Sequence, residues 1–244
     1  MRIESACITD KGLNPKYNVN EDNYLVMEQD GVFAVADGVG GAHAGDIASS
    51  AALKIISQGI NKFSNQFKNN KIVFLQKLIK AGNSAVYQQS IKKKKQMATT
   101  IAIMLIEENY AVLGHVGDSR IYVARNKNIL QLTRDHSKLQ ELLAQNPHLS
   151  IDRENYTDGH IITRALGIEK NVEPDIQKVI LKPNDVFILC TDGIYNHNTN
   201  DEMFDNVNQN KHNLRLVCEG LKKNCYARGA KDNLTAVVLR IISD

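Results

Sequence analysis

Short apolar runs recur along the chain, and four of them have an aspartate at one edge. The first run, Val32 to Ala36, has no polar break and stops at Asp37. Runs of this length are too short for helices and contain β-branched residues, so they predict buried strands. The same placement, at the edge of an apolar segment, recurs at three more aspartates: Asp118, Asp192 and Asp232.

Apolar residues at helical spacing predict the helices. One helix is expected after Asp46, which is a suitable N-cap residue, and a short helix is expected over residues 138–145. Longer helices are predicted over about 71–91 and 213–226.

The remaining apolar segments predict strands. A strand at 2–8 is followed by a hairpin of 24–27 with 32–36, and residues 98–133 are predicted to form an antiparallel meander. Because the helices fall between blocks of strands rather than alternating with single strands, the pattern predicts an α+β fold with mostly antiparallel sheets flanked by helices.

The composition limits the class of protein. A chain of 244 residues with 43% hydrophobic and 23% charged residues suits one soluble domain spanning residues 1–244. A net charge of +3 without a basic stripe argues against nucleic-acid binding. No apolar run is long enough to cross a membrane, and the four cysteines lack metal-type spacing. We therefore expect a cytoplasmic protein whose cysteines are small core residues.

The surroundings of Asp37 suggest a cation site. Gly38 and Gly40 follow it, and glycine lets backbone carbonyls approach a ligand closely. Hard cations prefer such oxygen ligands, although an aspartate and glycine after a strand more often form an ordinary turn. Two further acidic residues, Glu21 and Asp22, open the predicted hairpin, and taken alone they are more typical of a solvated acidic turn.

Two histidines lie near these acidic segments. His115 falls in a predicted strand just before Asp118, and His136 follows Asp135. A lone histidine is more often structural than a ligand, so neither is assigned a role.

An ordered set of short motifs runs through almost the whole chain. The motifs are NED at 20–22, ADGVGG at 36–41, GDSR at 117–120, HS at 136–137, TRALG at 163–167, TDG at 191–193 and KDNLTAVV at 231–238. In order and spacing they resemble those of the metal-dependent protein serine/threonine phosphatases (PPM, protein phosphatase 2C type), and the chain is most similar to the short, single-domain bacterial members.

The resemblance implies a four-layer α-β-β-α sandwich with a two-metal centre at one end of its two central sheets. Asp37 would bridge two ions, and Gly38 would give its carbonyl to one of them. The family pattern gives the other ligands: Asp192 and Asp232 for the second ion, Asp118 with Asp192 for a third ion, and Glu21 and Asp22 for metal-bound water. Ligands that are all oxygen favour Mg²⁺ or Mn²⁺.

The loop before the hairpin departs from the family. Members usually carry a phosphate-gripping arginine four residues before the glutamate of the NED motif, and this chain has Tyr17 there. Lys16 is next to it and offers a full charge, so Lys16 and Tyr17 are both expected as phosphate-binding residues.

The implied reaction is hydrolysis of phosphoserine and phosphothreonine on proteins by a metal-bridging water, without a covalent phosphoenzyme. The implied partners are phosphorylated proteins and a cognate kinase, and the protein is expected to be a monomer that takes part in signalling. Two alternatives stay open. One is a pseudophosphatase that binds phosphoproteins without turnover, because the arginine is missing. The other is a two-metal phosphohydrolase of small phosphoesters.

Overall fold

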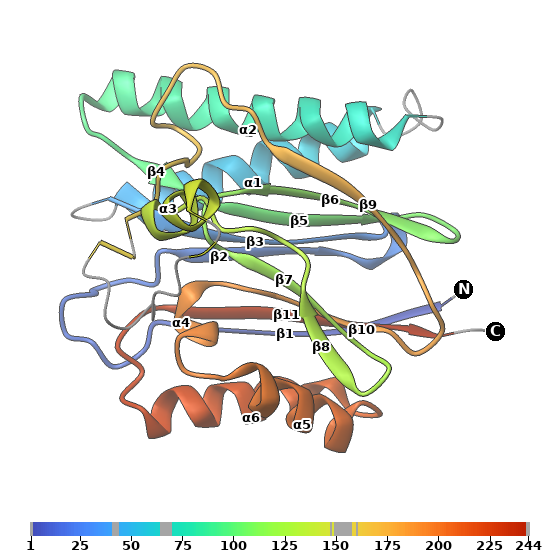
Figure 1. Cartoon of the computed structure of the whole chain (residues 1–244). Helices are drawn as coiled ribbons and strands as arrows, with labels where there is room; N and C mark the ends of the chain where they lie inside the picture. Colours follow the sequence, from blue (N-terminus) through green and yellow to red (C-terminus); the bar gives the residue numbers. More distant parts are fainter. Residues whose placement is uncertain are drawn as a thin grey trace.

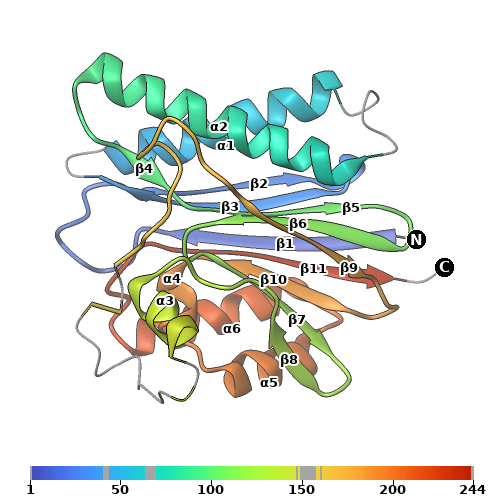
Figure 2. The same ribbon diagram turned by 45° about the horizontal axis from the view of Figure 1, so that its top comes forward.

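The computed structural model describes residues 2–40, 44–63, 70–146, 148, 158–159 and 161–242. Two sheets lie face to face, and each is covered on its outer side by a pair of helices (Figure 1). Figure 2 shows the same four layers after rotation. Helices α1 (Ala44–Phe63) and α2 (Lys71–Lys93) cover one sheet, and α5 (Asn200–Asn210) and α6 (Leu214–Ala227) cover the other. The predicted α-β-β-α sandwich is confirmed.

The first sheet has the strand order β2-β3-β5-β6-β9, and every neighbouring pair is antiparallel. The short strand β4 pairs with β3 beside this path. Its strands are β2 (Asp22–Met27), β3 (Val32–Val39), β4 (Ala98–Thr99), β5 (Ile101–Ile106), β6 (Tyr110–Val116) and β9 (Asp175–Ile180).

The second sheet has the order β1-β11-β10-β7-β8 and is also antiparallel throughout. Its strands are β1 (Arg2–Asp10), β7 (Arg120–Arg125), β8 (Asn128–Gln131), β10 (Val186–Cys190) and β11 (Leu234–Ile242). Three short helices complete the fold: η1 (Glu28–Asp30), α3 (Lys138–Gln145) and α4 (Asp192–Tyr195).

The uninterrupted apolar strands are explained by burial on both faces. Successive residues of a strand point to opposite sides, so one set meets the facing sheet and the other meets the helices. Phe33, Met104 and Phe187 belong to the core between the sheets. Ala34 and Ile103, their neighbours along β3 and β5, pack in the core under α1 and α2.

The predicted meander over residues 98–133 is wrong in its middle. β6 and β7 follow each other in the chain but lie in different sheets, so the chain crosses between the sheets at residues 117–119. Gly117 allows this crossing, because its φ is +106° and an added Cβ would lie 2.6 Å from the Thr100 side chain. Asp118 therefore lies between the two sheets rather than at the end of one.

Three local expectations are also corrected. β3 continues through Asp37, because its N–H donates to the Thr100 hydroxyl at 2.9 Å and its carbonyl accepts from the Thr100 N–H at 2.8 Å. Asp46 lies within the first turn of α1 rather than at its N-cap. Cys7 is exposed, because β1 is an edge strand, whereas the other three cysteines are buried. Among the described helices, none is both long and apolar enough for a membrane span.

Candidate metal centre

The predicted acidic residues come together from both sheets. Asp22 and Asp37 face each other as register partners of β2 and β3 in the first sheet. Asp192 is the first residue of α4, directly after β10, and Asp232 lies just before β11 in the second sheet. Asp118 lies on the crossing between the sheets. Gly41, the last residue of the predicted glycine loop, is outside the described residues.

The electrostatics show that these carboxylates are close neighbours. Removal from water, followed by the charges of Asp22, Asp192, Asp118 and Asp232, raises the pKa of Asp37 well above its usual range. Burial raises the pKa of Asp192 in the same way, and Asp118 and Asp232 add to the effect. Negative charge concentrated in this way favours either protonation or a bound cation.

Asp22 and Asp118 are almost wholly buried, with 5% of each residue exposed. Burial, reinforced by nearby carboxylates, raises the pKa of Asp22 to about 7 and that of Asp118 to about 6. The Thr191 hydroxyl donates to Asp22 Oδ2 at 2.8 Å, whereas Asp22 Oδ1 is buried and has no hydrogen-bond partner among the described residues.

The donor set fits a hard divalent cation. A buried carboxylate oxygen without a donor is costly, and a cation or a cation-held water would satisfy it. Within the described ranges, no three His, Cys, Asp or Glu side chains converge closely enough to hold an ion as they stand. The carboxylates thus surround one region without forming a finished coordination shell.

Asn233 connects the segments of the centre, a role that its local sequence does not predict. Its Oδ1 accepts from the Glu21 N–H at 2.7 Å, and its Nδ2 donates to the Lys11 carbonyl at 2.8 Å. Gly193 packs so tightly against it that an added Cβ would lie 1.9 Å from the Asn233 carbonyl oxygen. The only signal for this role was the position of Asn233 beside Asp232 in a family motif.

Gly38 lies in an equally crowded position. An added Cβ would lie 2.2 Å from the Gly45 carbonyl oxygen and 2.6 Å from that of Glu21. The Gly38 N–H donates to the Glu21 carbonyl at 3.2 Å. The Glu21 carboxylate is close to Gly45, whose added Cβ would lie 2.7 Å from Oε2. Glu21 and Gly38 therefore belong to the same cluster as Asp37.

The two predicted phosphate-binding residues differ in position. The Tyr17 hydroxyl faces the Asp232 carboxylate, and burial together with Asp232, Asp192 and Asp37 raises its pKa. The Lys11 ammonium donates to the Tyr17 carbonyl at 2.8 Å and helps to hold this loop. Lys16 is exposed. Tyr17 therefore lies among the carboxylates, and Lys16 lies at the surface of the same loop.

A buried network lies beside Asp118. The Tyr195 hydroxyl donates to Asp118 Oδ2 at 3.3 Å, and the Arg120 guanidinium stacks 3.7 Å above the centre of the Tyr195 ring. Arg120 also donates through Nε and Nη2 to the two oxygens of Asp135, at 2.9 and 2.6 Å. This bidentate pair fixes the guanidinium beside the centre.

Known proteins resemble this chain over most of its length. The protein phosphatase 2C family model matches residues 16–234. The serine/threonine phosphatase stp of Listeria monocytogenes serotype 4b is 32% identical over 226 residues, covering 90% of this chain and 89% of that protein. Protein phosphatase PhpP of Streptococcus pneumoniae serotype 2 is 29% identical over 246 residues, with 97% of each chain covered.

A solved structure agrees in fold. The catalytic domain of the serine/threonine protein phosphatase PstP, in complex with two manganese ions, superposes with a TM-score of 0.84. Its sequence is 26% identical, and the superposition covers 99% of both chains.

Proposed function

This chain belongs to the protein phosphatase 2C family, and we propose that it hydrolyses phosphoserine and phosphothreonine on proteins with two divalent cations held by its aspartates. The observation that carries the proposal is the convergence of buried carboxylates from both sheets around Asp37. Two of the relatives it matches are named as a serine/threonine phosphatase and a protein phosphatase, and PstP carries two manganese ions.

We assign the ligands as the family pattern implies. Asp37 would hold both cations, and the Gly38 carbonyl would hold one of them. Asp192 and Asp232 would hold the second cation, and Asp118 with Asp192 would hold a third. Mg²⁺ and Mn²⁺ both suit a site made only of oxygen ligands.

When bound, the cations neutralise the phosphoryl oxygens and lower the pKa of a water that attacks phosphorus in line. Asp22 would orient this water. The Thr191 hydroxyl donates a hydrogen bond to Oδ2 of Asp22, so the buried Oδ1 would be the oxygen that accepts from the water. Glu21, adjacent in the chain and in the cluster, would hold a second water. Attack by water needs no protein nucleophile, so no phosphoenzyme is expected.

Tyr17 takes the position of the usual phosphate-binding arginine. Its hydroxyl is a single neutral donor, whereas arginine offers a charged, planar fork. We therefore expect substrate phosphate to be held less tightly here than in arginine-bearing relatives. Lys16, exposed on the same loop, is the alternative donor.

The substrates would be phosphorylated proteins and the opposing enzyme a protein kinase. We propose that the enzyme acts as a monomer in the cytoplasm, where its four free cysteines suit a reducing compartment.

Turnover of a phosphothreonine peptide tests the proposal. Activity is expected with Mg²⁺ or Mn²⁺ and should disappear in EDTA, with Asp37→Asn as the inactive control. Peptide binding without turnover would support the pseudophosphatase alternative. Faster turnover of nucleotides than of peptides would support a phosphohydrolase of small phosphoesters.

A further inference from the structure

His136 forms two hydrogen bonds to Gly117, in the crossing between the sheets that carries Asp118. The Gly117 N–H donates to His136 Nδ1 at 3.0 Å, and the His136 N–H donates to the Gly117 carbonyl at 2.8 Å. Residues 117–119 belong to neither sheet, so no strand ladder holds their backbone. The two bonds to His136 therefore fix the residue directly before Asp118.

The imidazole ring of His136 faces a carboxylate on its far side, where Nε2 has no partner in hydrogen-bond geometry among the described residues. Because Nδ1 accepts from a backbone N–H, the neutral ring carries its proton on Nε2. That Nε2 lies 3.2 Å from Asp175 Oδ2, and Asp175 Oδ1 accepts from Arg164 Nη1 at 2.8 Å. The His115 ring packs against His136, with 4.7 Å between the ring centres.

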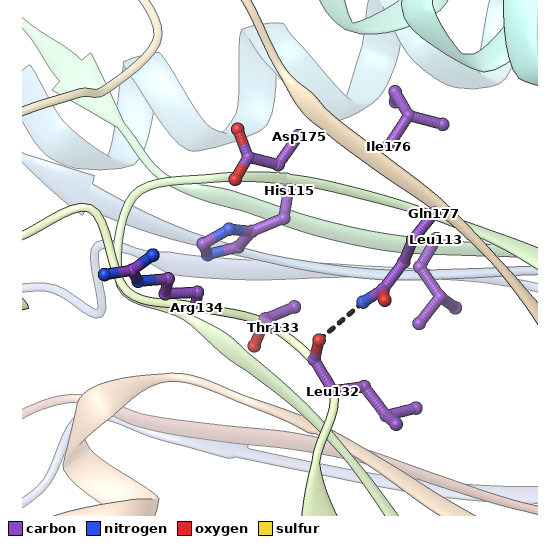
Figure 3. A pocket seen from close by; sticks show the side chains of 8 residues that line it. All are labelled: Leu113, His115, Leu132, Thr133, Arg134, Asp175, Ile176 and Gln177. Carbon is purple, nitrogen blue, oxygen red and sulfur yellow. Dashed lines mark hydrogen bonds between the residues drawn. The ribbon is translucent and has the colours of Figure 1, made fainter. Parts of the chain in front are cut away.

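Two members of this assembly, His115 and Asp175, line a pocket of about 420 Å³ at the edge of the sandwich. Figure 3 shows Asp175 and His115 side by side in that wall. His136 is 7% exposed, whereas 57% of the Asp175 side chain is exposed. The ring is thus buried against the crossing, and its carboxylate partner is open to solvent.

We propose that His136 is a positioning residue for Asp118, acting through the backbone of Gly117. The Tyr195 hydroxyl donates a long hydrogen bond, at 3.3 Å, to the Asp118 carboxylate. Because this anchor is weak, the direction of the carboxylate depends strongly on the backbone at Asp118. The Asp175 carboxylate faces the ring, the ring accepts from the Gly117 N–H, and Gly117 sets the direction of the Asp118 side chain. The inference rests on the proposed function, in which Asp118 holds a cation.

Two matched substitutions separate the roles of the two ring nitrogens. His136→Asn keeps an oxygen acceptor close to the position of Nδ1, whereas His136→Gln keeps a polar group near Nε2 and loses the acceptor for Gly117. Asp175→Ala is a third variant, and its exposed side chain means that its removal should leave the fold intact.

The first readout is amide hydrogen exchange of Gly117 by NMR in metal-free protein. We expect faster exchange of this amide in His136→Gln, and exchange close to that of the wild type in His136→Asn. Asp175→Ala should give a smaller increase. Exchange at Gly117 that is unchanged in His136→Gln would overturn the proposal without reference to any metal.

The second readout is Mn²⁺ binding by calorimetry. Loss of a residue that orients a metal ligand typically weakens metal binding by roughly 10–100-fold. His136→Gln should therefore lower the affinity for the Mn²⁺ ion that Asp118 would hold by about tenfold or more. His136→Asn should bind as the wild type does. His136→Gln should cause no further loss in an Asp118→Asn background.

The Asp118→Asn variant separates the two possible failures. If Asp118→Asn weakens an Mn²⁺ site but His136→Gln does not, the positioning role is wrong and the metal assignment stands. If Asp118→Asn leaves Mn²⁺ binding unchanged, Asp118 is not a ligand, and the positioning role falls with that assignment. Additive losses in the double variant would also overturn the proposal.

Discussion

In the metal-free protein, the change in unfolding free energy caused by Asp22→Asn is expected to be more favourable at pH 8 than at pH 5. The carboxyl group is buried, and burial raises its pKa in the folded protein to about 7 from the usual 3.8 of an aspartate. A group of this kind contributes stability at low pH, which is lost as the pH rises through the folded-state pKa. At about 1.4 kcal/mol per pH unit, the loss between pH 5 and pH 8 amounts to about 2–3 kcal/mol of unfolding free energy.

Other groups also change the stability over this range. Burial lowers the pKa of His115 to about 3. The unfolded chain then binds this proton more readily than the folded protein, so His115 makes stability rise with pH, opposite to the effect of Asp22. His115 is present in both proteins, so its contribution cancels in the difference between wild type and Asp22→Asn. That difference reports Asp22 together with its effect on Asp37 and Asp192, whose pKa values the charge of Asp22 helps to raise.

The assay is thermal unfolding of both proteins in EDTA at pH 5 and pH 8. For a chain of this size, 1 kcal/mol corresponds to about 2–4 °C, so the difference in Tm should change by roughly 5–10 °C between the two pH values. Asparagine can still accept from the Thr191 hydroxyl, so this bond is retained. A Tm difference that is the same at both pH values would refute the argument that the Asp22 carboxyl is protonated near neutral pH.

Asp37→Asn and Asp192→Asn should each abolish nearly all turnover of a phosphothreonine peptide with Mn²⁺ while circular dichroism stays unchanged, because each removes an anionic ligand. Near wild-type rates would place the centre elsewhere. Tyr17→Arg should lower KM for the same peptide by roughly tenfold, since a charge-assisted hydrogen bond is worth about 1.5–3 kcal/mol. Lys16→Ala is the comparison, and an unchanged KM in Tyr17→Arg would mean that position 17 does not reach the phosphate. Asn233→Ala should lower the unfolding free energy by about 2–4 kcal/mol in urea titrations, because two backbone groups lose their partner. Stability equal to that of the wild type would contradict this role.

Features set by nearby residues could be predicted from the sequence. β10 is an apolar run whose end is marked by Asp192, and both follow from local patterning. The helix α2 was predicted over 71–91 and extends over Lys71–Lys93. The ordered motifs supplied the four-layer arrangement, which periodicity alone could not distinguish from other antiparallel folds.

Features set by distant partners could not be predicted. The apolar runs predict that β6 and β7 are strands but do not say that they belong to different sheets, so the crossing at Asp118 was missed. His136 acts on Gly117, 19 residues away, and Asn233 binds the backbone of Glu21, 212 residues away. Neither role leaves a local pattern. Tyr17 lies among the carboxylates because its loop folds back over Asp232.

The position of β11 has a consequence for how the protein forms on the ribosome. β11 lies between β1 and β10, and it pairs with β1 along its length, from Arg2 opposite Ile242 to Asp10 opposite Leu234. During translation β1 emerges first and must wait for β11 before it has its neighbour in the sheet. Asp232, two residues before the start of β11, reaches the centre only then. A ribosome-bound nascent chain that stops at α6 should therefore lack a complete centre. Pairing across such a separation is slow, so joining β1 to β11 is expected to be the late step at which dephosphorylation first becomes possible.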